Sequence, residues 1–306
     1  MIEARNLTKR FGTTVAVDDL SFDVKPGIVT GFLGPNGAGK TTTMRMILGL
    51  DRPNGGHVTI DGKRFRDLPV PLGEVGALLD PRAFHGGRTG YNHLLCLAQS
   101  NGLPARRVDE VLAIVGLETA AKRRAGGFSM GMGQRLGIAA ALLGDPRILM
   151  FDEPVNGLDP EGIAWVRRLM RDLAAEGRTV FVSSHLMSEM ALTADHVLVI
   201  GRGRLIRDES IADFIDSSSK ASVVVRSPDS ERLADLIGRD GGGVTNDNTG
   251  ALVVTGLDAA AVGELAASEG IVLHELAPQR ASLEEAFMEL TQDSVEFHAS
   301  GKVGGR

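Results

Sequence analysis

The segment Gly34-Pro35-Asn36-Gly37-Ala38-Gly39-Lys40-Thr41-Thr42 decides the fold. It follows a short apolar run, residues 28–33, that is typical of a buried strand, and it opens a helical apolar pattern over residues 44–48. Glycines at the spacing G-x-x-x-x-G-K-[ST] let backbone N–H groups wrap a phosphate chain at a helix N-terminus. We expect Lys40 to reach the β- and γ-phosphates and the Thr41 hydroxyl to ligate Mg²⁺. The flanking strand and helix disfavour the alternative, a glycine turn with a surface lysine.

Further apolar runs indicate the class of fold. Residues 147–151, 179–184 and 197–200 are typical of buried strands, and long helical patterns separate them. Near the N-terminus, residues 14–20 and 20–24 predict two strands broken by acidic turns. Strands alternating with helices indicate an α/β fold with a mostly parallel sheet.

Two acidic residues end the strand at residues 147–151. Asp152 can hold Mg²⁺ there, and Glu153 can polarise an attacking water as a general base. Upstream, Ser129 is a candidate N-cap for a helix over residues 134–143, whose N-terminus could hold an anion; the alternative is a helix that is merely capped. Asp159-Pro160 predicts another helix start, with Asp159 as N-cap.

Composition excludes several classes of protein. The 306 residues carry 33 Lys+Arg and 39 Asp+Glu, a net charge of −6 that argues against broad nucleic-acid binding. With 43% hydrophobic and 24% charged residues the chain is not a disordered one. The single cysteine, Cys96, excludes a disulfide framework within the chain. We expect no signal peptide in the charged N-terminal segment and no bilayer-spanning apolar run.

The order of these motifs resembles the nucleotide-binding domain of an ABC transporter over about residues 2–215. The most specific part is a phosphate-binding loop, then a serine-glycine signature that begins 23 residues before Asp152, then a lone histidine, His185, after the next strand. The resemblance implies a P-loop NTPase fold with a mostly parallel core sheet, an antiparallel subdomain and a helical subdomain at about residues 85–145. It also implies a head-to-tail homodimer around two ATP molecules, in which each phosphate-binding loop faces the partner's signature.

The resemblance also assigns roles residue by residue. It implies Glu153, His185 and Lys40 as catalytic residues. It implies a metal site made by Thr41, Asp80 and Asp152. It implies that ATP is bound by Phe11 on the adenine, by the signature residues Ser129 and Gly131, by Asp159 in the loop Asn156-Gly157-Leu158-Asp159, and by the phosphate-binding residues Gly34, Pro35, Asn36, Gly37, Ala38, Gly39, Lys40, Thr41 and Thr42.

The chain departs from the family pattern at two places. The usual signature Leu-Ser-Gly-Gly-Gln here reads Phe128-Ser129-Met130-Gly131-Met132, so a glycine and an amide are replaced by methionines. The position that usually carries a glutamine beside Mg²⁺ carries Asp80. Asp80, the stretch His185–Met190 and the stretch Ser282–Phe287 resemble bacterial subunits that work with separate permeases in drug or antibiotic export.

The remaining third of the chain, after residue 216, has a different pattern of predicted strands and helices. We predict a first domain over residues 1–216, a linker at 217–221, a small α+β domain at 222–292 and a disordered tail at 293–306. The small domain is expected to contain the strands Ser222–Arg226, Ala251–Thr255 and Ile271–Leu276 and the helices Ser230–Arg239, Asp258–Ser268 and Ser282–Leu290.

Together these observations predict an ATP-hydrolysing subunit with ATP and Mg²⁺ as cofactors. It would form a homodimer, bind a separate multi-pass permease at the inner face of the cell membrane, in the cytoplasm, and bind no nucleic acid. One alternative is an ABC ATPase that acts on ribosomes or DNA, which the single phosphate-binding loop and the acidic charge disfavour. Another is a regulatory nucleotide switch, which the presence of both Glu153 and His185 disfavours.

Overall fold

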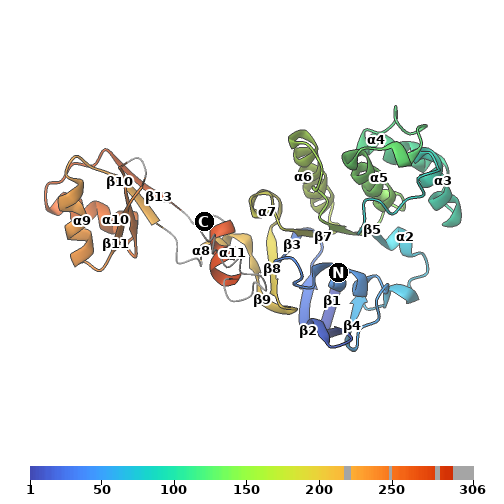
Figure 1. Ribbon diagram of the computed structural model, residues 1–306, viewed down its shortest axis with the longest axis horizontal. Coiled ribbons are helices and arrows are strands. Elements are labelled where there is room, and N and C mark those ends of the chain that lie inside the picture. Colours follow the sequence, from blue (N-terminus) through green and yellow to red (C-terminus); the bar gives the residue numbers. More distant parts are fainter. Residues whose placement is uncertain (217–221, 248–249, 280–282, 292–306) are drawn as a thin grey trace, which may run out of the picture. The chain divides into compact units, whose positions relative to one another are not determined.

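The computed structural model describes residues 1–216, 222–247, 250–279 and 283–291 (Figure 1). It divides the chain into two compact units, Met1–Ser210 and Ile211–Gln292. This division falls before the predicted domain end at residue 216. The predicted linker at 217–221 and the predicted tail at 293–306 lie outside the described residues.

A six-stranded sheet forms the centre of the first unit. All neighbouring strands run parallel except the last pair, in which β9 is antiparallel to β8. The mostly parallel sheet predicted from the apolar runs is therefore confirmed. In spatial order the strands are β5 (Val75–Leu78), β6 (Ile148–Asp152), β7 (Thr179–Ser184), β3 (Val29–Leu33), β8 (His196–Gly201) and β9 (Arg204–Ser210).

A second, antiparallel sheet lies beside the first in Figure 1. Its order is β2 (Thr14–Val24), β1 (Ile2–Phe11) and β4 (Gly55–Ile60). The prediction of two separate strands between residues 14 and 24 is wrong, because β2 is continuous. Asp19 takes a left-handed conformation (φ 55°), and the pairing with β1 shifts register nearby, so a bulge absorbs the acidic residues without ending the strand.

The hydrophobic core of this unit lies between the two sheets. Phe22 of β2, Phe32 of β3 and Phe181 of β7 pack with ring centroids 5.1–5.9 Å apart. The helix α1 (Lys40–Ile47) contributes its buried side chains Met44, Met46 and Ile47 to the same cluster. The core therefore holds the strand before the phosphate-binding loop and the helix after it.

Helices cover the parallel sheet and extend beyond its β5 edge (Figure 1). The helical subdomain predicted at about residues 85–145 contains α3, α4 and α5. The helix α5 begins at Met130, four residues before the predicted start, because Ser129 caps it there. The helices and short turns are α2 (Pro71–Glu74), α3 (Gly90–Ser100), α4 (Arg106–Val115), α5 (Met130–Leu142), α6 (Pro160–Ala175), α7 (Met187–Thr193), and the 3₁₀ turns η1 (Phe65–Asp67) and η2 (Ala125–Gly127).

The second unit is built around an antiparallel sheet of order β11-β12-β10-β13. One face of the sheet packs its valines and leucines against α9 and α10. The strand predicted at Ile271–Leu276 begins four residues too early, since Ile271 packs in the core ahead of β13, and β11 is an additional strand. The elements are α8 (Ile211–Asp216), β10 (Ser222–Arg226), α9 (Ser230–Arg239), β11 (Gly243–Asn246), β12 (Leu252–Thr255), α10 (Ala259–Ser268), β13 (Glu275–Gln279) and α11 (Leu283–Thr291).

Gly56 at the start of β4 offers a test of this packing. A Cβ at Gly56 would lie 2.2 Å from the Asn6 carbonyl oxygen, whereas a Cβ at Gly62, which shares its left-handed backbone, would meet nothing within 4 Å. We expect Gly62→Ala to cost only the left-handed penalty of about 1 kcal/mol. Gly56→Ala should lower the melting temperature at least twice as far in thermal unfolding, because β1 and β4 must also separate. Equal shifts would contradict this account.

Candidate nucleotide-binding site

The loop between β3 and α1 is shaped by close backbone contacts. Gly37 and Gly39 have positive φ angles, 82° and 104°. A Cβ on Gly39 would lie 2.5 Å from the Ala16 carbonyl oxygen, and one on Gly34 would lie 2.6 Å from that of Ile200. These positions therefore require glycine, as a loop that turns its backbone inward does.

This loop borders a cavity of about 360 Å³. The residues lining it come from β2, from the loop and α1, from the segment after β5, from the start of α5, and from the end of β6 and the segment after it. They are Ala16, Pro35, Asn36, Gly37, Ala38, Gly39, Lys40, Thr41, Thr42, Leu79, Pro81, Met130, Asp152, Glu153 and Asn156. Nearly all the predicted phosphate-binding residues and both strand-end acids thus share one cavity.

Lys40 is the cation of this cavity. Its side chain is buried, and Nζ donates hydrogen bonds to the carbonyl oxygens of Gly34 (2.6 Å) and Pro35 (3.3 Å). Burial lowers the pKa of the Lys40 ammonium, while the carboxylates of Glu153 and Asp152 oppose that shift. Its charge is therefore poorly solvated and can be offset by an anion that enters the cavity.

Thr41 and Asp152 form the candidate metal site. Thr41 Oγ1 donates to Asp152 Oδ2 (2.6 Å), and the Ser183 hydroxyl donates to the other carboxylate oxygen. A hydroxyl and a carboxylate in contact are hard oxygen donors that suit Mg²⁺, so the residues present fit this ion. The sequence analysis assigned no role to Ser183. The feature that could have indicated one is the position of this serine at the carboxyl end of β7, the strand next to β6.

Glu153 lies beside His185, a contact that the sequence analysis did not predict. His185 Nδ1 is 2.7 Å from Glu153 Oε2. The Glu153 backbone is left-handed, with φ 53°, which is uncommon outside glycine. Its N–H donates to the Ser183 carbonyl oxygen, and its own carbonyl accepts a hydrogen bond from Gln134 Nε2 (3.2 Å). Several contacts therefore hold this residue in an unusual conformation.

The signature segment begins α5 at the side of the cavity. Ser129 Oγ accepts a hydrogen bond from the Met132 N–H (3.2 Å), which confirms the predicted N-cap. Met130 lines the cavity and packs over Gly157, where an added Cβ would lie 2.5 Å from its sulfur. Gly131 also lies close to Gly157, since a Cβ added to Gly131 would be 3.3 Å from the Gly157 carbonyl oxygen. Sequence reasoning treated Met130 as a lost glycine and missed this contact.

Three predicted site residues have local partners. Asp159 Oδ1 accepts from the Gly162 N–H (2.8 Å), which confirms Asp159 as the N-cap of α6. Phe11 is half exposed, and Lys9 Nζ lies 5.0 Å from its ring centroid. Asp80 Oδ1 accepts from the Arg82 N–H (2.8 Å). Among the described residues that line the cavity, Phe11 and Asp80 are not found, so their roles toward adenine and metal stay predictions.

The fold and this site define a P-loop nucleotide-binding domain of the ABC type. Residues 17–156 match the family described as "ABC transporter", and residues 221–284 match a domain of unknown function. The uncharacterized ABC transporter ATP-binding protein YhcH of Bacillus subtilis is 36% identical, over 97% of each chain. The chain therefore belongs to the family of ABC transporter ATP-binding proteins.

Other relatives agree with this assignment. The bacitracin transport ATP-binding protein BcrA of Bacillus licheniformis is 45% identical over 68% of this chain and 69% of that protein. Among solved structures, the dimeric post-hydrolysis state of an ATP-binding cassette bound to ADP and Pi has a TM-score of 0.63 and 26% identity. The match covers 69% of this chain and 99% of that one. The first unit is thus an ATP-binding ATPase domain.

Lys40 gives a prediction with a definite pH dependence. Folding lowers the pKa of the Lys40 ammonium, so at a pH below that lowered pKa the buried charge reduces the stability of the folded protein. This loss of stability disappears as the pH rises toward 10.5, the pKa of the lysine in the unfolded chain. We expect Lys40→Met to abolish ATP binding. It should also raise the melting temperature of the nucleotide-free protein near neutral pH, by an amount that shrinks in alkaline solution.

The control is Lys63→Met at an exposed lysine, which should change neither quantity. Scanning fluorimetry across the pH range measures both variants. A lower melting temperature for Lys40→Met near neutral pH would show that the hydrogen bonds to Gly34 and Pro35 outweigh the cost of burial.

Proposed function

We propose that this ATPase subunit binds Mg-ATP in the described cavity, forms a homodimer with two nucleotides between its protomers, and powers a separate membrane permease that exports an antibiotic or drug. One observation carries the proposal: Lys40, Thr41, Asp152 and Glu153 line one cavity, and His185 contacts Glu153. The groups that we propose to bind phosphate, hold the metal and activate water therefore lie close together.

The chemistry follows from the positions of these side chains. Lys40 neutralises charge on the β- and γ-phosphates. The Glu153 carboxylate accepts a proton from the attacking water, and His185, in contact with Glu153, orients that carboxylate and reaches the γ-phosphate. Thr41 and Asp152 would hold Mg²⁺, which stabilises negative charge on the phosphates. Because Ser183 also bonds to Asp152, the carboxylate is fixed in place before the metal binds.

Dimerisation supplies the second half of each site. Ser129 and Gly131 lie at the N-terminus of α5, where backbone N–H groups and the helix dipole favour an anion. Ser129 is not among the described residues that line the cavity of its own chain. In the proposed dimer it instead faces the γ-phosphate of the ATP bound by the partner chain. The similarity to a dimeric cassette with ADP and Pi supports this arrangement.

The partner in the membrane is inferred from the relatives. Among the described residues, no helix is both long enough and apolar enough to cross a bilayer. Relatives at 33–45% identity are named for bacitracin and lantibiotic transport, which supports an antibiotic as the exported substrate. The segment at residues 81–93, a loop with several exposed residues that leads into the first turn of α3, is the candidate docking segment for the permease. The subunit would then sit at the cytoplasmic face of the cell membrane.

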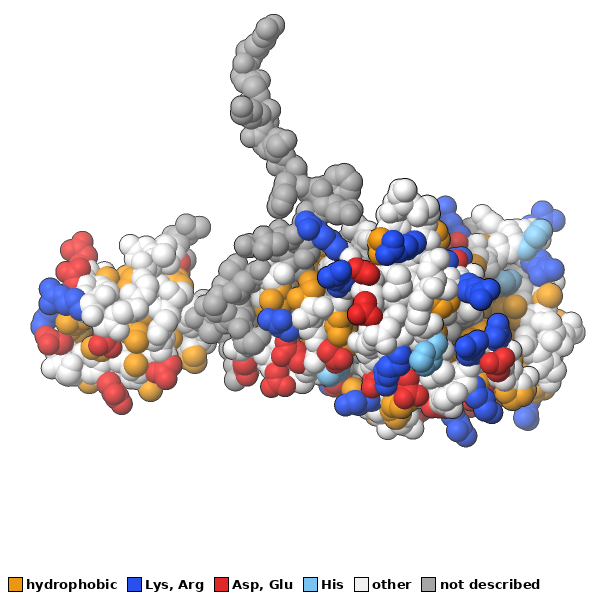
Figure 2. Space-filling model, turned by 90° about the horizontal axis from the view of Figure 1, so that it is seen from below, with side chains coloured by type: hydrophobic (Ala, Val, Ile, Leu, Met, Phe, Trp, Pro, Cys, Tyr) orange, Lys and Arg blue, Asp and Glu red, His pale blue; other side chains and the backbone are white. Residues whose placement is uncertain are grey.

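Surface charge supports a protein partner over a nucleic acid. On the visible face of the first unit, Lys and Arg side chains are interspersed with Asp and Glu (Figure 2). The unit contains ion pairs such as Arg5–Asp23 and Arg45–Asp51, in which charge is compensated locally. A duplex would need a continuous basic surface.

Glu153→Gln tests the assignment of the general base. The substitution keeps the size of the side chain and removes its basicity, so we expect ATP hydrolysis to fall at least about 100-fold while ATP binding persists. With ATP, the variant should accumulate as a dimer in light-scattering chromatography. The matched control, Glu118→Gln at an exposed site in the helical subdomain, should behave as the unmodified protein does.

The same variant identifies the partner. Tagged Glu153→Gln protein, purified from native membranes in detergent with ATP, should retain one multi-pass membrane protein. Recovery with ribosomal or DNA-associated proteins instead would overturn the transport proposal and leave the ATPase site intact. Unchanged hydrolysis by Glu153→Gln would overturn the assignment of the base.

A further inference from the structure

The helix α5 joins the signature segment at its start to the strand that carries the catalytic acids beyond its end. Near its start, Gln134 is fully buried, and its Nε2 donates to the Glu153 carbonyl oxygen (3.2 Å). Its other amide atom, Oε1, has no hydrogen-bond partner within the described part of the chain. A buried amide with one hydrogen-bonding atom left without a partner lowers the stability of the fold. The hydrogen bond from Gln134 to Glu153 therefore suggests a role in function.

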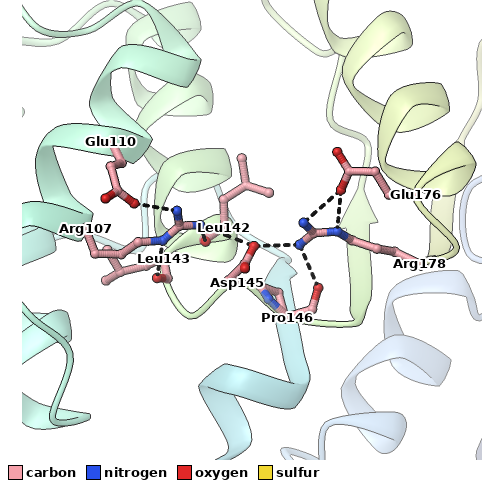
Figure 3. Close-up of polar contacts among 8 residues, drawn as sticks. All are labelled: Arg107, Glu110, Leu142, Leu143, Asp145, Pro146, Glu176 and Arg178. Carbon is pink, nitrogen blue, oxygen red and sulfur yellow. Dashed lines mark hydrogen bonds and ion pairs between the residues drawn. The ribbon is translucent and has the colours of Figure 1, made fainter.

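The other end of α5 is held by a shared carboxylate. Arg107 of α4 donates to the carbonyl oxygens of Leu142 (3.0 Å) and Leu143 (3.1 Å), which end α5. Arg107 Nη2 and Arg178 Nη1 both approach Asp145 Oδ1, at 3.4 and 2.9 Å. Arg178 directly precedes β7, so Figure 3 shows Asp145 bridging the helical subdomain and the parallel sheet.

This bridge stands at the entry to β6. Asp145 has a left-handed backbone (φ 53°), and Pro146 and Arg147 lead from it into the strand that ends at Asp152. Arg178 also donates to the Pro146 carbonyl oxygen (3.1 Å) and pairs with Glu176. An exposed ion pair alone contributes little to stability. Here, however, Asp145 is the carboxylate that the two arginines share, since Arg107 otherwise pairs with Glu110 and Arg178 with Glu176. Its loss would remove the link between the two arginines across the junction.

We propose that Gln134 and Asp145 are positioning residues for Glu153. Asp145 sets the position of the C-terminal end of α5 against β6 and β7. The hydrogen bond from Gln134 near the start of α5 then couples the position of the helix to the left-handed backbone of Glu153. A movement of the helical subdomain would then reach the general base through α5 directly. The inference rests on the proposed role of Glu153 and adds a second set of residues that determine its geometry.

Conservative substitutions separate this role from folding. Asp145→Asn and Asp145→Gly both tolerate the left-handed backbone. Gln134→Met keeps the side chain's length while removing both amide atoms, the donor to the Glu153 carbonyl and the unpartnered oxygen. We expect each to lower kcat for Mg-ATP at least about fivefold, which corresponds to about 1 kcal/mol. Affinity for a fluorescent ATP analogue should stay within about twofold, because the phosphate-binding loop is untouched.

The double variant gives the sharper result. Gln134 and Asp145 make no contact with each other among the hydrogen bonds and ion pairs of the described residues, so independent effects on kcat would multiply. If both act through α5, the combination of Gln134→Met and Asp145→Gly should be no slower than the slower single variant. Multiplicative losses, or a kcat equal to that of the unmodified protein, would overturn the proposal.

Matched controls exclude general effects of the substitutions. Asp61→Gly removes a carboxylate from another left-handed aspartate, which is paired with the N-terminal ammonium, and Gln99→Met changes an exposed glutamine of α3. Both should keep kcat. If the unmodified protein hydrolyses ATP and Glu153→Gln does not, but the positioning variants match the controls, the proposed function stands and this inference fails. If Glu153→Gln hydrolyses ATP normally, the assignment of Glu153 as the base fails first, and with it the role on which this inference rests.

Discussion

The hydrogen bond between Thr41 and Asp152 is the interaction on which the site depends. Thr41 belongs to the helix that follows β3, and Asp152 ends β6, with β7 between these strands in the sheet. Because the three strands are parallel, their carboxyl ends meet at one edge, and Ser183 at the end of β7 contacts the same carboxylate. The packing of Phe32 against Phe181 and the pairing of β6 with β7 therefore bring together the loop after β3 and Asp152, the proposed phosphate-binding and metal-binding groups, which are far apart in sequence.

Local patterns predicted the part of the site that depends on local structure. The loop before α1 and the acids after β6 could be recognised because strand, glycine spacing and helix start are all encoded within a few residues. The N-caps Ser129 and Asp159 were predictable for the same reason. The roles of Ser183, Gln134 and Met130 could not be predicted this way, because each depends on a contact with a residue far along the chain.

The errors in secondary structure have the same origin. Acidic residues in the middle of β2 look like a turn, yet a bulge at Asp19 accommodates them while β1 continues to pair. The apolar residues from Ile271 look like a strand, but Ile271 fills the core of the second unit before β13 begins. Phe11 and Asp80 carry roles taken from the family pattern alone; in this chain their contacts are with Lys9 and Arg82.

The central claim, that Thr41 and Asp152 mark the metal position of an ATP site, is tested most directly by calorimetric titration of Asp152→Asn. The account predicts that ATP without metal binds this variant as it binds the unmodified protein, because Lys40 and the loop remain. It also predicts that Mg²⁺ no longer tightens that binding, because the neutral amide is a poor ligand. An unchanged gain in affinity on adding Mg²⁺ would contradict the account and place the metal elsewhere.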